Sequence, residues 1–243
     1  MQFKADLHIH TILSPCGDLW MSPSEIVKKA LSEELDIIGI TDHNSTLNAE
    51  ATAKIAEKHG IKVLLGAEIS TVEEIHCLCF VESVELLKQM QEEIEKTIIK
   101  IPHDEERFGE QLIVDENENI VGDIDYLLIS STSMDINQVQ EMVMKLDGIF
   151  IPAHVNRSAN SLYSQLGFFP FDLNPHAIEL SKIAKIDDFL SLHPEISKFP
   201  ITTASDAHYI EDIGAAGIII EAPDNSFQQI KNALISKNFT IFK

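Results

Sequence analysis

Short apolar runs alternate with helix-like segments along this chain of 243 residues, and that alternation limits the fold more than any other feature. The runs are rich in Ile, Val and Leu, as expected of strands that are buried on both faces. The segments between them place apolar residues at helical spacing. Such alternation is typical of α/β domains built from strand–helix units. We expect strands at 3–8, 36–41, 61–68, 75–81, 149–154, 177–181, 201–208 and 217–222.

The helix-like segments begin with recognisable capping residues. In "SPSEIVKKALSEEL" (22–35), Ser22 can cap the first turn, Pro23 suits the first helical position, and Glu25 stands at capping-box spacing. We expect further helices at 47–60, 84–100, 136–148 and 226–238.

The region 84–147 departs from the alternation. Within it, "QLIVDENENIV" (111–121) predicts a hairpin with an acidic turn. We interpret 84–147 as an insertion or an elaborated connection within a single domain that spans 1–243. Seven or so short strands of the parallel type then predict a TIM-like, barrel-shaped α/β fold.

The charge balance restricts the partners of this chain. It carries 18 basic and 39 acidic side chains, a formal net charge of −21. Such a surface repels polyanions, which disfavours extended nucleic acid as a partner and leaves a short oligonucleotide open. A small phosphorylated substrate would need a local positive field, and bound cations could supply it.

The sequence also favours a cytoplasmic protein without a membrane segment. The longest apolar stretches, such as 215–220, are too short to span a bilayer, and the first residues lack a signal-peptide pattern. Three cysteines, an odd number, argue against a disulfide framework.

Side chains that commonly bind metals recur near the ends of the predicted strands. Because the carboxyl ends of barrel strands meet on one face, we expect these side chains to converge there. Residues at i and i+2 of a strand point to the same side, so His8 and His10 can bind one ion together. Of the adjacent Asp42 and His43, only one is expected to be a ligand. The candidates are His8, His10, Asp18, His43, Glu68, His76, His154, Asp206 and His208.

Other histidines and the cysteines fit structural roles. His59, His103, His176 and His193 lie at a helix end or in loops away from these strand ends. Cys77 and Cys79 flank His76, but Cys16 is remote from them in sequence, so we interpret Cys77 and Cys79 as thiols packed within a strand. Phosphate-binding glycine loops and the G-x-S-x-G elbow are absent.

Taken together, six motifs resemble those of the polymerase-and-histidinol-phosphatase (PHP) family. They are "DLHIHT" (6–11), "GITDHN" (39–44), "GAEIS" (66–70), "IHCLCF" (75–80), "PAHVNR" (152–157) and "SDAH" (205–208). The resemblance implies a distorted (β/α)7 barrel, phosphoesterase activity, and three divalent ions, Mn, Fe or Zn. It implies one site of His8, His10, Glu68 and Asp206, a second of Asp18, His43 and His208, and a third of Glu68, His76 and His154.

The expected reaction is hydrolysis of a phosphate ester of a nucleotide or another small anionic metabolite, with a metal-bridging hydroxide as the nucleophile. Asp18 stands where some histidinol phosphatases have His, which is similar to the branch of 3′,5′-nucleotide bisphosphate phosphatases and short-RNA exonucleases. Arg157, Asn44 and Asn156 are candidate substrate contacts. A histidinol-phosphate-type phosphatase and a non-catalytic metal-binding PHP module stay open as alternatives.

Overall fold

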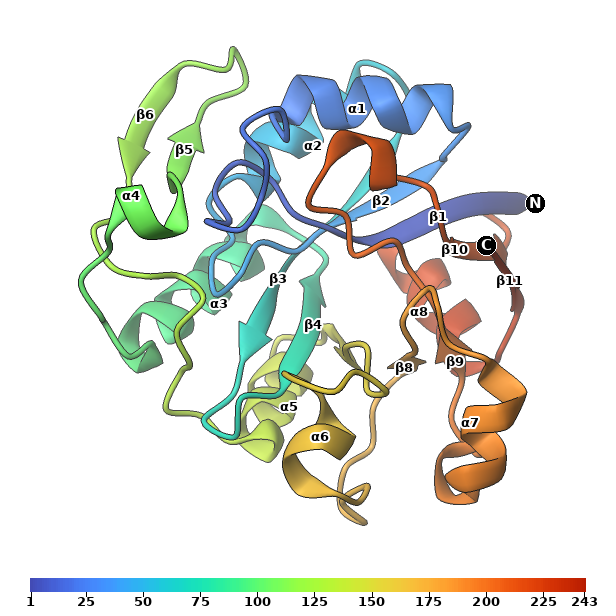
Figure 1. Cartoon of the computed structure of the whole chain (residues 1–243). Coiled ribbons are helices and arrows are strands. Elements are labelled where there is room, and N and C mark those ends of the chain that lie inside the picture. The colour runs from blue at the N-terminus through green and yellow to red at the C-terminus, as the bar shows by residue number, and fades with distance from the viewer.

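A curved mixed sheet of seven strands forms the centre of the computed structural model, which describes all residues 1–243 (Figure 1). The strand order is β11-β10-β1-β2-β3-β4-β7. The strands are β1 (Gln2–Ile9), β2 (Ile37–Ile40), β3 (Lys62–Ser70), β4 (His76–Val81), β7 (Ile149–Pro152), β10 (Gly217–Glu221) and β11 (Phe239–Phe242). Two short parallel strands, β8 (Ile178–Glu179) and β9 (Ile201–Thr202), form a separate ladder.

The small ladder lies between β7, at one edge of the main sheet, and β1. The backbone N–H of His176 donates to the carbonyl of Phe150, which ties the start of β8 to β7. A parallel bridge between Ile9 and Ala207 ties the chain after β9 to β1. The strands therefore surround a common interior, as expected for a barrel-like α/β fold.

The expectation of parallel strands throughout is wrong. In the main sheet, β1 pairs with β2 and β2 with β3 in parallel, whereas the pairs β3–β4, β4–β7, β1–β10 and β10–β11 are antiparallel. The connection at 71–75 is too short for the helical crossover that a parallel pair requires. An apolar run buried on both faces reads alike in either direction, so the composition of the strands did not reveal this reversal.

Helices surround the sheet (Figure 1). The predicted helices are confirmed with shorter bounds, and Ser22 caps the first of them with Pro23 at its start. The sequence analysis did not predict the short helices α4, α6 and α7 or the strand β11. The helices are α1 (Pro23–Ser32), α2 (Ala49–Glu57), α3 (Val84–Thr97), α4 (Glu105–Phe108), α5 (Ile136–Lys145), α6 (Leu162–Leu166), α7 (Ile186–Leu192) and α8 (Phe227–Ile235), with 3₁₀ turns at Pro194–Ile196 and Ile210–Asp212.

The hairpin predicted at 111–121 is confirmed as β5 (Leu112–Val114) and β6 (Ile120–Asp123), and it extends away from the main sheet (Figure 1). Within the region 84–147, α3 and α5 contact the central strands, so they belong to the α/β layers. Only the segment between α3 and α5 lies outside these layers. Asn48 secures the hairpin by donating to Leu112 O and accepting from Val114 N.

Two apolar clusters support the site. The larger lies between the sheet and helices such as α1, α3 and α5. The smaller joins alternate residues of the strands, among them Leu64 and Leu78, to α8. Glu68 lies four residues after Leu64 and His76 two before Leu78, so both project on the same face as the smaller cluster. No helix is both long and apolar enough to cross a membrane.

Candidate metal centre

The candidate metal-binding side chains converge at one edge of the sheet. His8 lies near the end of β1, Glu68 near the end of β3, and His43 directly after β2. His154 follows β7, while Asp206 and His208 follow β9. His76 begins its strand, yet β4 runs antiparallel to β3, so its first residue lies at the same edge as the ends of its neighbours.

The protonation of His8 and His10 follows from their outer contacts. Nδ1 of His8 lies 3.2 Å from both carboxylate oxygens of Glu179, which only accept, so this nitrogen carries the proton. Ser14 Oγ donates to Asp42 Oδ1 at 2.7 Å and therefore accepts from Nδ1 of His10 at 3.0 Å. In the neutral form of each ring, the form that binds metals, the free lone pair is therefore on Nε2.

Those lone pairs face one another among carboxylates. His8 Nε2 lies 3.2 Å from His10 Nε2, 3.3 Å from Glu68 Oε1 and 3.3 Å from Asp206 Oδ1. His8, His10 and Glu68 are almost completely buried. Two carboxylates and two imidazoles this close together and largely out of water require positive charge between them, either from a proton on a ring or from a metal ion. Imidazole nitrogens and carboxylates are suitable ligands for Mn, Fe or Zn, so the residues fit a divalent ion.

Glu68 connects this group to further imidazoles. Its Oε1 lies 3.0 Å from His76 Nδ1 and 3.0 Å from His154 Nε2, and its Oε2 lies 3.0 Å from His43 Nδ1. Burial raises the pKa of the Glu68 carboxyl, but the charges of the surrounding imidazoles outweigh it and hold that pKa well below its usual range. The two oxygens of one ionised carboxylate therefore face different sets of ligands.

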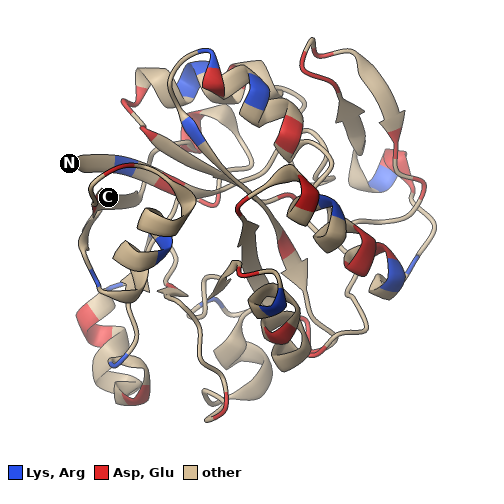
Figure 2. Ribbon diagram, turned by 180° about the vertical axis from the view of Figure 1, so that it is seen from behind, with Lys and Arg blue, Asp and Glu red and all other residues tan.

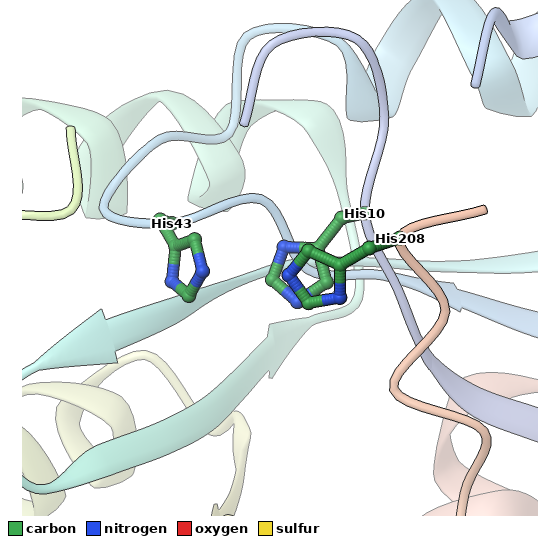
Figure 3. A group of neighbouring side chains, drawn as sticks. All are labelled: His10, His43 and His208. Atoms are coloured by element: carbon green, nitrogen blue, oxygen red, sulfur yellow. The ribbon is translucent and has the colours of Figure 1, made fainter. Parts of the chain in front are cut away.

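A further group contains only imidazoles. His10, His43 and His208 offer nitrogens that lie within 4.8 Å of one another (Figure 3). The rings of His10 and His208 stack with centroids 4.0 Å apart. His208 Nδ1 lies 3.1 Å from the carbonyl oxygen of Asp206, which fixes its proton there and leaves Nε2 free.

Asp18 is the one candidate ligand that does not join these groups. Its Oδ1 accepts from the backbone N–H of Trp20 at 2.8 Å, and no ion pair links its carboxylate to an imidazole. Its backbone N–H donates to the carbonyl of His208, so the loop itself crosses the site.

Cys16 lies in the loop between Ser14 and Asp18, near the imidazoles of His43 and His208. Burial raises the pKa of its thiol, but these imidazoles outweigh burial and lower the pKa to about 6. Cys77 and Cys79 are fully buried in β4, as expected, and burial raises the pKa of each thiol well above its ordinary value.

The sequence analysis missed Glu179; spacing alone left the choice between Asp42 and His43 open, and the family resemblance implied His43. Glu179 Oε1 also accepts from the backbone N–H of His154 at 3.1 Å, so one carboxylate positions two candidate ligands. A lone glutamate in the apolar run "AIELS" was the available signal. Asp42 accepts from Thr11 and Ser14 behind His10, so His43 is the residue that faces the site.

The three candidate substrate contacts have different surroundings. Arg157 pairs with Asp206 Oδ2 and keeps 46% of its side chain exposed. Asn44 is fully buried, donates to the carbonyls of Leu128 and Ser130, and accepts from a third main-chain group. Asn156 is held by two hydrogen bonds to Ser181. Arg157 is therefore the one of the three that faces solvent beside the site.

Three of the nine non-glycine residues with positive φ lie at the same edge. Asn44, His154 and Asp206 adopt φ values of 45°, 30° and 51°, in the left-handed region that residues other than glycine seldom occupy. Such conformations persist where the surrounding contacts impose them, and they cluster at functional sites.

A cavity of about 330 Å³ opens beside His76. Its wall combines small polar side chains with Ile99 and Ile101 from the segment after α3 and with Glu74 from the β3–β4 connection. A cavity of this volume lies within the range of small-molecule sites.

Comparison with known proteins agrees with this architecture. The PHP domain model matches residues 6–156, and a model described as PHP-associated matches 196–238. The solved structure of the lesion-specific endonuclease Q of Pyrococcus furiosus superimposes with a TM-score of 0.75 at 20% identity, over 99% of this chain and 58% of that one.

Two relatives match over shorter segments. An uncharacterized protein of Methanocaldococcus jannaschii is 36% identical over 102 residues, which cover 38% of this chain and 60% of the relative. A 5′-3′ exoribonuclease of Haemophilus influenzae is 32% identical over 71 residues, 29% of this chain and 25% of that enzyme. The match to the family model spans more than half of the residues and contains most of the convergent ligands, so the chain belongs to the PHP family.

Proposed function

We propose that this chain is a metal-dependent phosphoesterase that hydrolyses a phosphate ester of a nucleotide or another small anionic metabolite. The observation that carries the proposal is the close group of four atoms of metal-binding type, His8 Nε2, His10 Nε2, Glu68 Oε1 and Asp206 Oδ1, with 3.2–3.3 Å from His8 Nε2 to each of the others. When bound, divalent ions would supply an activated water and would offset the charge that builds on the phosphoryl oxygens.

Three ions, Mn, Fe or Zn, account for the remaining ligands. His8, His10, Glu68 and Asp206 would hold the first, and Glu68, His76 and His154 another. His43 and His208 would hold a third ion, together with a ligand from the loop that contains Asp18. Glu68 supports this sharing because its two oxygens face different imidazoles.

The residues around the ions would position the substrate. Arg157 has a half-exposed guanidinium beside Asp206 and can donate to a phosphoryl oxygen. The cavity beside His76 would receive the organic part of the substrate against Ile99 and Ile101. Its modest volume favours a small molecule or the end of a short oligonucleotide.

The charge distribution also favours a small substrate. Lys and Arg are interspersed with Asp and Glu along the helices and do not form a separate basic track (Figure 2). With a net charge of −21, the surface opposes the approach of a long polyanion. A test of substrates should nevertheless include duplex DNA, because the fold resembles that of an endonuclease.

A histidinol-phosphate-type phosphatase is the second candidate. Glu74 lines the cavity beside His76, and a carboxylate there would attract the ammonium group of an amino-alcohol phosphate. A neutral nucleobase would gain less from this charge than an ammonium group.

The test is phosphate release from a substrate panel by protein loaded with Mn²⁺. The panel contains 3′-phosphoadenosine 5′-phosphate, short oligoribonucleotides, mononucleotides, histidinol phosphate, an aryl phosphate and duplex DNA with an abasic lesion. We expect turnover of a nucleotide or small metabolite that EDTA abolishes. A preference for histidinol phosphate would support the second candidate, and cleavage of the duplex alone would contradict the small-substrate proposal.

Glu68→Gln is the matched inactive variant. It keeps the size of the side chain but removes the charge that faces His43, His76 and His154. We expect at least two ions to be lost and activity to be abolished. Wild-type turnover in a Glu68→Gln protein with full metal content would refute the assigned role of Glu68.

A further inference from the structure

We propose that Trp20 and Tyr209 form a subsite that stacks the nucleobase of a nucleotide substrate. The inference rests on the proposed function and deepens it, because it selects a nucleotide from the open substrate classes and assigns residues to its base. The two side chains line a pocket of about 330 Å³ together with Asp18, Glu25, Ile210 and Glu211. This pocket shares no residue with the cavity beside His76.

The fold does not account for the ring of Trp20. It is the only tryptophan of the chain, and 73% of the residue is exposed. Its ring stacks on no other aromatic side chain, and no Lys or Arg lies over it. A large ring left in water contributes little to the core, and exposed apolar groups that gather around a pocket are typical of a binding surface.

The backbone nevertheless holds Trp20 in place. Its N–H donates to Asp18 Oδ1 at 2.8 Å. The next residue, Met21, is fully buried, and its N–H donates to Asp18 O at 2.9 Å. Ile12 N–H donates to Met21 O, also at 2.9 Å. A ring presented by a fixed loop loses less conformational freedom when a ligand binds, which favours affinity.

Tyr209 presents the second ring of the pocket, and half of the residue is exposed. Of the three tyrosines, Tyr126 and Tyr163 donate their hydroxyls to glutamates, whereas the hydroxyl of Tyr209 has no hydrogen-bond partner in the chain. Its carbonyl accepts from Asp212 N–H at 3.1 Å, and Ile210 packs against the larger apolar cluster. The backbone is therefore fixed while the ring and its hydroxyl are free to contact a ligand.

The pocket adjoins the metal centre. Tyr209 directly follows His208, whose carbonyl accepts from Asp18 N–H at 2.8 Å. Consecutive Cα atoms lie about 3.8 Å apart, so a phosphate at the ion beside His208 and a base at Tyr209 can belong to one nucleotide. The ring centroid of His43 lies 5.2 Å from that of His76 and 5.9 Å from that of His208. The cavity beside His76 would then receive a second organic group, such as the next nucleotide of a short chain.

The carboxylates of the pocket determine which ligand suits it. Glu25 and Glu211 line it beside the two rings, and no Lys or Arg does. Carboxylates only accept hydrogen bonds, so they suit the exocyclic amino groups of adenine and cytosine and repel a phosphate. We therefore expect the base in the pocket and the phosphate on the ions. Uracil lacks an amino group and should bind more weakly.

The first test uses Trp20 as the reporter, since the chain has no other tryptophan. Protein loaded with Mn²⁺ is titrated with a phosphonate analogue of AMP, in which a methylene group replaces the ester oxygen and prevents hydrolysis. We expect saturable quenching of tryptophan fluorescence, weaker binding of the uridine analogue, and no quenching by methylphosphonate, which lacks a base. Free tryptophan in the same solutions corrects for light absorbed by the bases.

Absence of quenching by the AMP analogue, or equal quenching by methylphosphonate, would overturn the stacking subsite. Equal affinities for the adenosine and uridine analogues would refute the role of Glu25 and Glu211 in selecting the base.

The second test compares substrates with and without a base. In Trp20→Ala, the ratio of kcat/KM for AMP to kcat/KM for ribose 5-phosphate should fall at least about fivefold, as expected when a base loses a stacking partner. Trp20→Phe keeps a ring and should retain most of the ratio. Leu19→Ala is the matched control, because Leu19 is exposed next to Trp20 but does not line the pocket. An unchanged ratio in Trp20→Ala would contradict the assignment.

The outcomes separate this subsite from the proposed function. If the protein hydrolyses phosphate esters but neither test responds at Trp20, the subsite is wrong while the phosphoesterase stands. If it hydrolyses no phosphate ester, the proposed function is wrong, and the fluorescence titration, which needs no turnover, still decides whether Trp20 contacts a base.

Discussion

At the scale of single residues, the order of the metal centre depends on groups that never face the ion. Glu179 accepts from His8 Nδ1 and from the backbone of His154, and so fixes one ring and the strained turn beside it. Ser14 accepts from His10 Nδ1 and donates to Asp42, so these two residues fix the ring of His10. Such outer carboxylates orient the imidazole and increase its basicity.

Glu179→Ala should therefore weaken metal binding by roughly 10- to 100-fold, the usual effect of losing an outer partner of a ligand histidine. Glu179→Gln should retain much of the affinity, because its carbonyl oxygen can still accept from His8 Nδ1. Metal affinity from competition with a chelator would measure both. Glu57→Ala, at an exposed helix end, is the control. Equal affinities in all three variants would exclude this role for Glu179.

Arg157 can act on the substrate or on Asp206, and kinetics distinguish the two roles. As a phosphate contact it contributes about 1.5–3 kcal/mol, so Arg157→Ala should lower kcat/KM by roughly 10- to 100-fold with metal content unchanged. If Arg157 only positions Asp206, bound metal should fall with activity. Arg107→Ala, a change to the only other arginine, should alter neither quantity.

At the scale of elements, the sequence predicted the positions of strands better than their directions. The apolar runs and their terminal histidines located β1, β2, β3, β4 and β7, but nothing in "IHCLCF" indicated that this strand is reversed. Reversal explains why His76 begins its strand and still meets Glu68. Contacts between distant loops, such as the hydrogen bond from Asp18 N–H to His208 O, depend on how the elements pack together and have no local signal in the sequence.

His176 links β7 to the segment before β8 and gives an element-level prediction. Its Nδ1 accepts from Phe150 N at 3.1 Å, so the ring must be neutral there. Burial, assisted by the charge of Lys231, lowers the pKa of His176 to about 4. At pH 7 the ring is neutral in both states. As pH falls below about 6.5, the unfolded chain binds the proton first, and stability decreases until about pH 4.

His176→Asn keeps an acceptor for Phe150 N but does not titrate. Its thermal midpoint should therefore decrease less than that of the wild type between pH 7 and pH 4.5, measured by circular dichroism in EDTA. The exposed His59→Asn should follow the wild type. Parallel pH profiles for the wild type and His176→Asn would show that protonation of His176 is not linked to unfolding.

At the scale of the whole molecule, the metal centre connects the ends of the chain. The proposed ligands come from β1, β3, the start of β4, and the loops after β2, β7 and β9, so bound ions would hold most of the barrel together. Saturating one site at 100 times its Kd stabilises the folded state by about 2.7 kcal/mol. For a chain of this length that corresponds to roughly 5–11 °C in Tm.

Removal of metal by EDTA should therefore lower Tm by at least about 5 °C, and Glu68→Gln should show a much smaller shift. Scanning calorimetry of the metal-loaded and chelated protein measures the difference. Identical melting temperatures for the two wild-type samples would mean that no ion is bound tightly to the folded state.

The net charge of −21 gives the last prediction, because it sets how salt affects the encounter with substrate. The Debye length shortens from about 30 Å at 0.01 M salt to about 10 Å at 0.1 M, so added salt screens the long-range repulsion between an acidic protein and an anion. We expect kcat/KM for a short oligonucleotide to rise several-fold over this range, and that for a singly phosphorylated substrate to rise less. A decrease with salt would instead indicate release of counterions from a cationic binding track. That outcome would contradict the small-substrate proposal and point to a nuclease with a basic path that the interspersed charges in Figure 2 do not suggest.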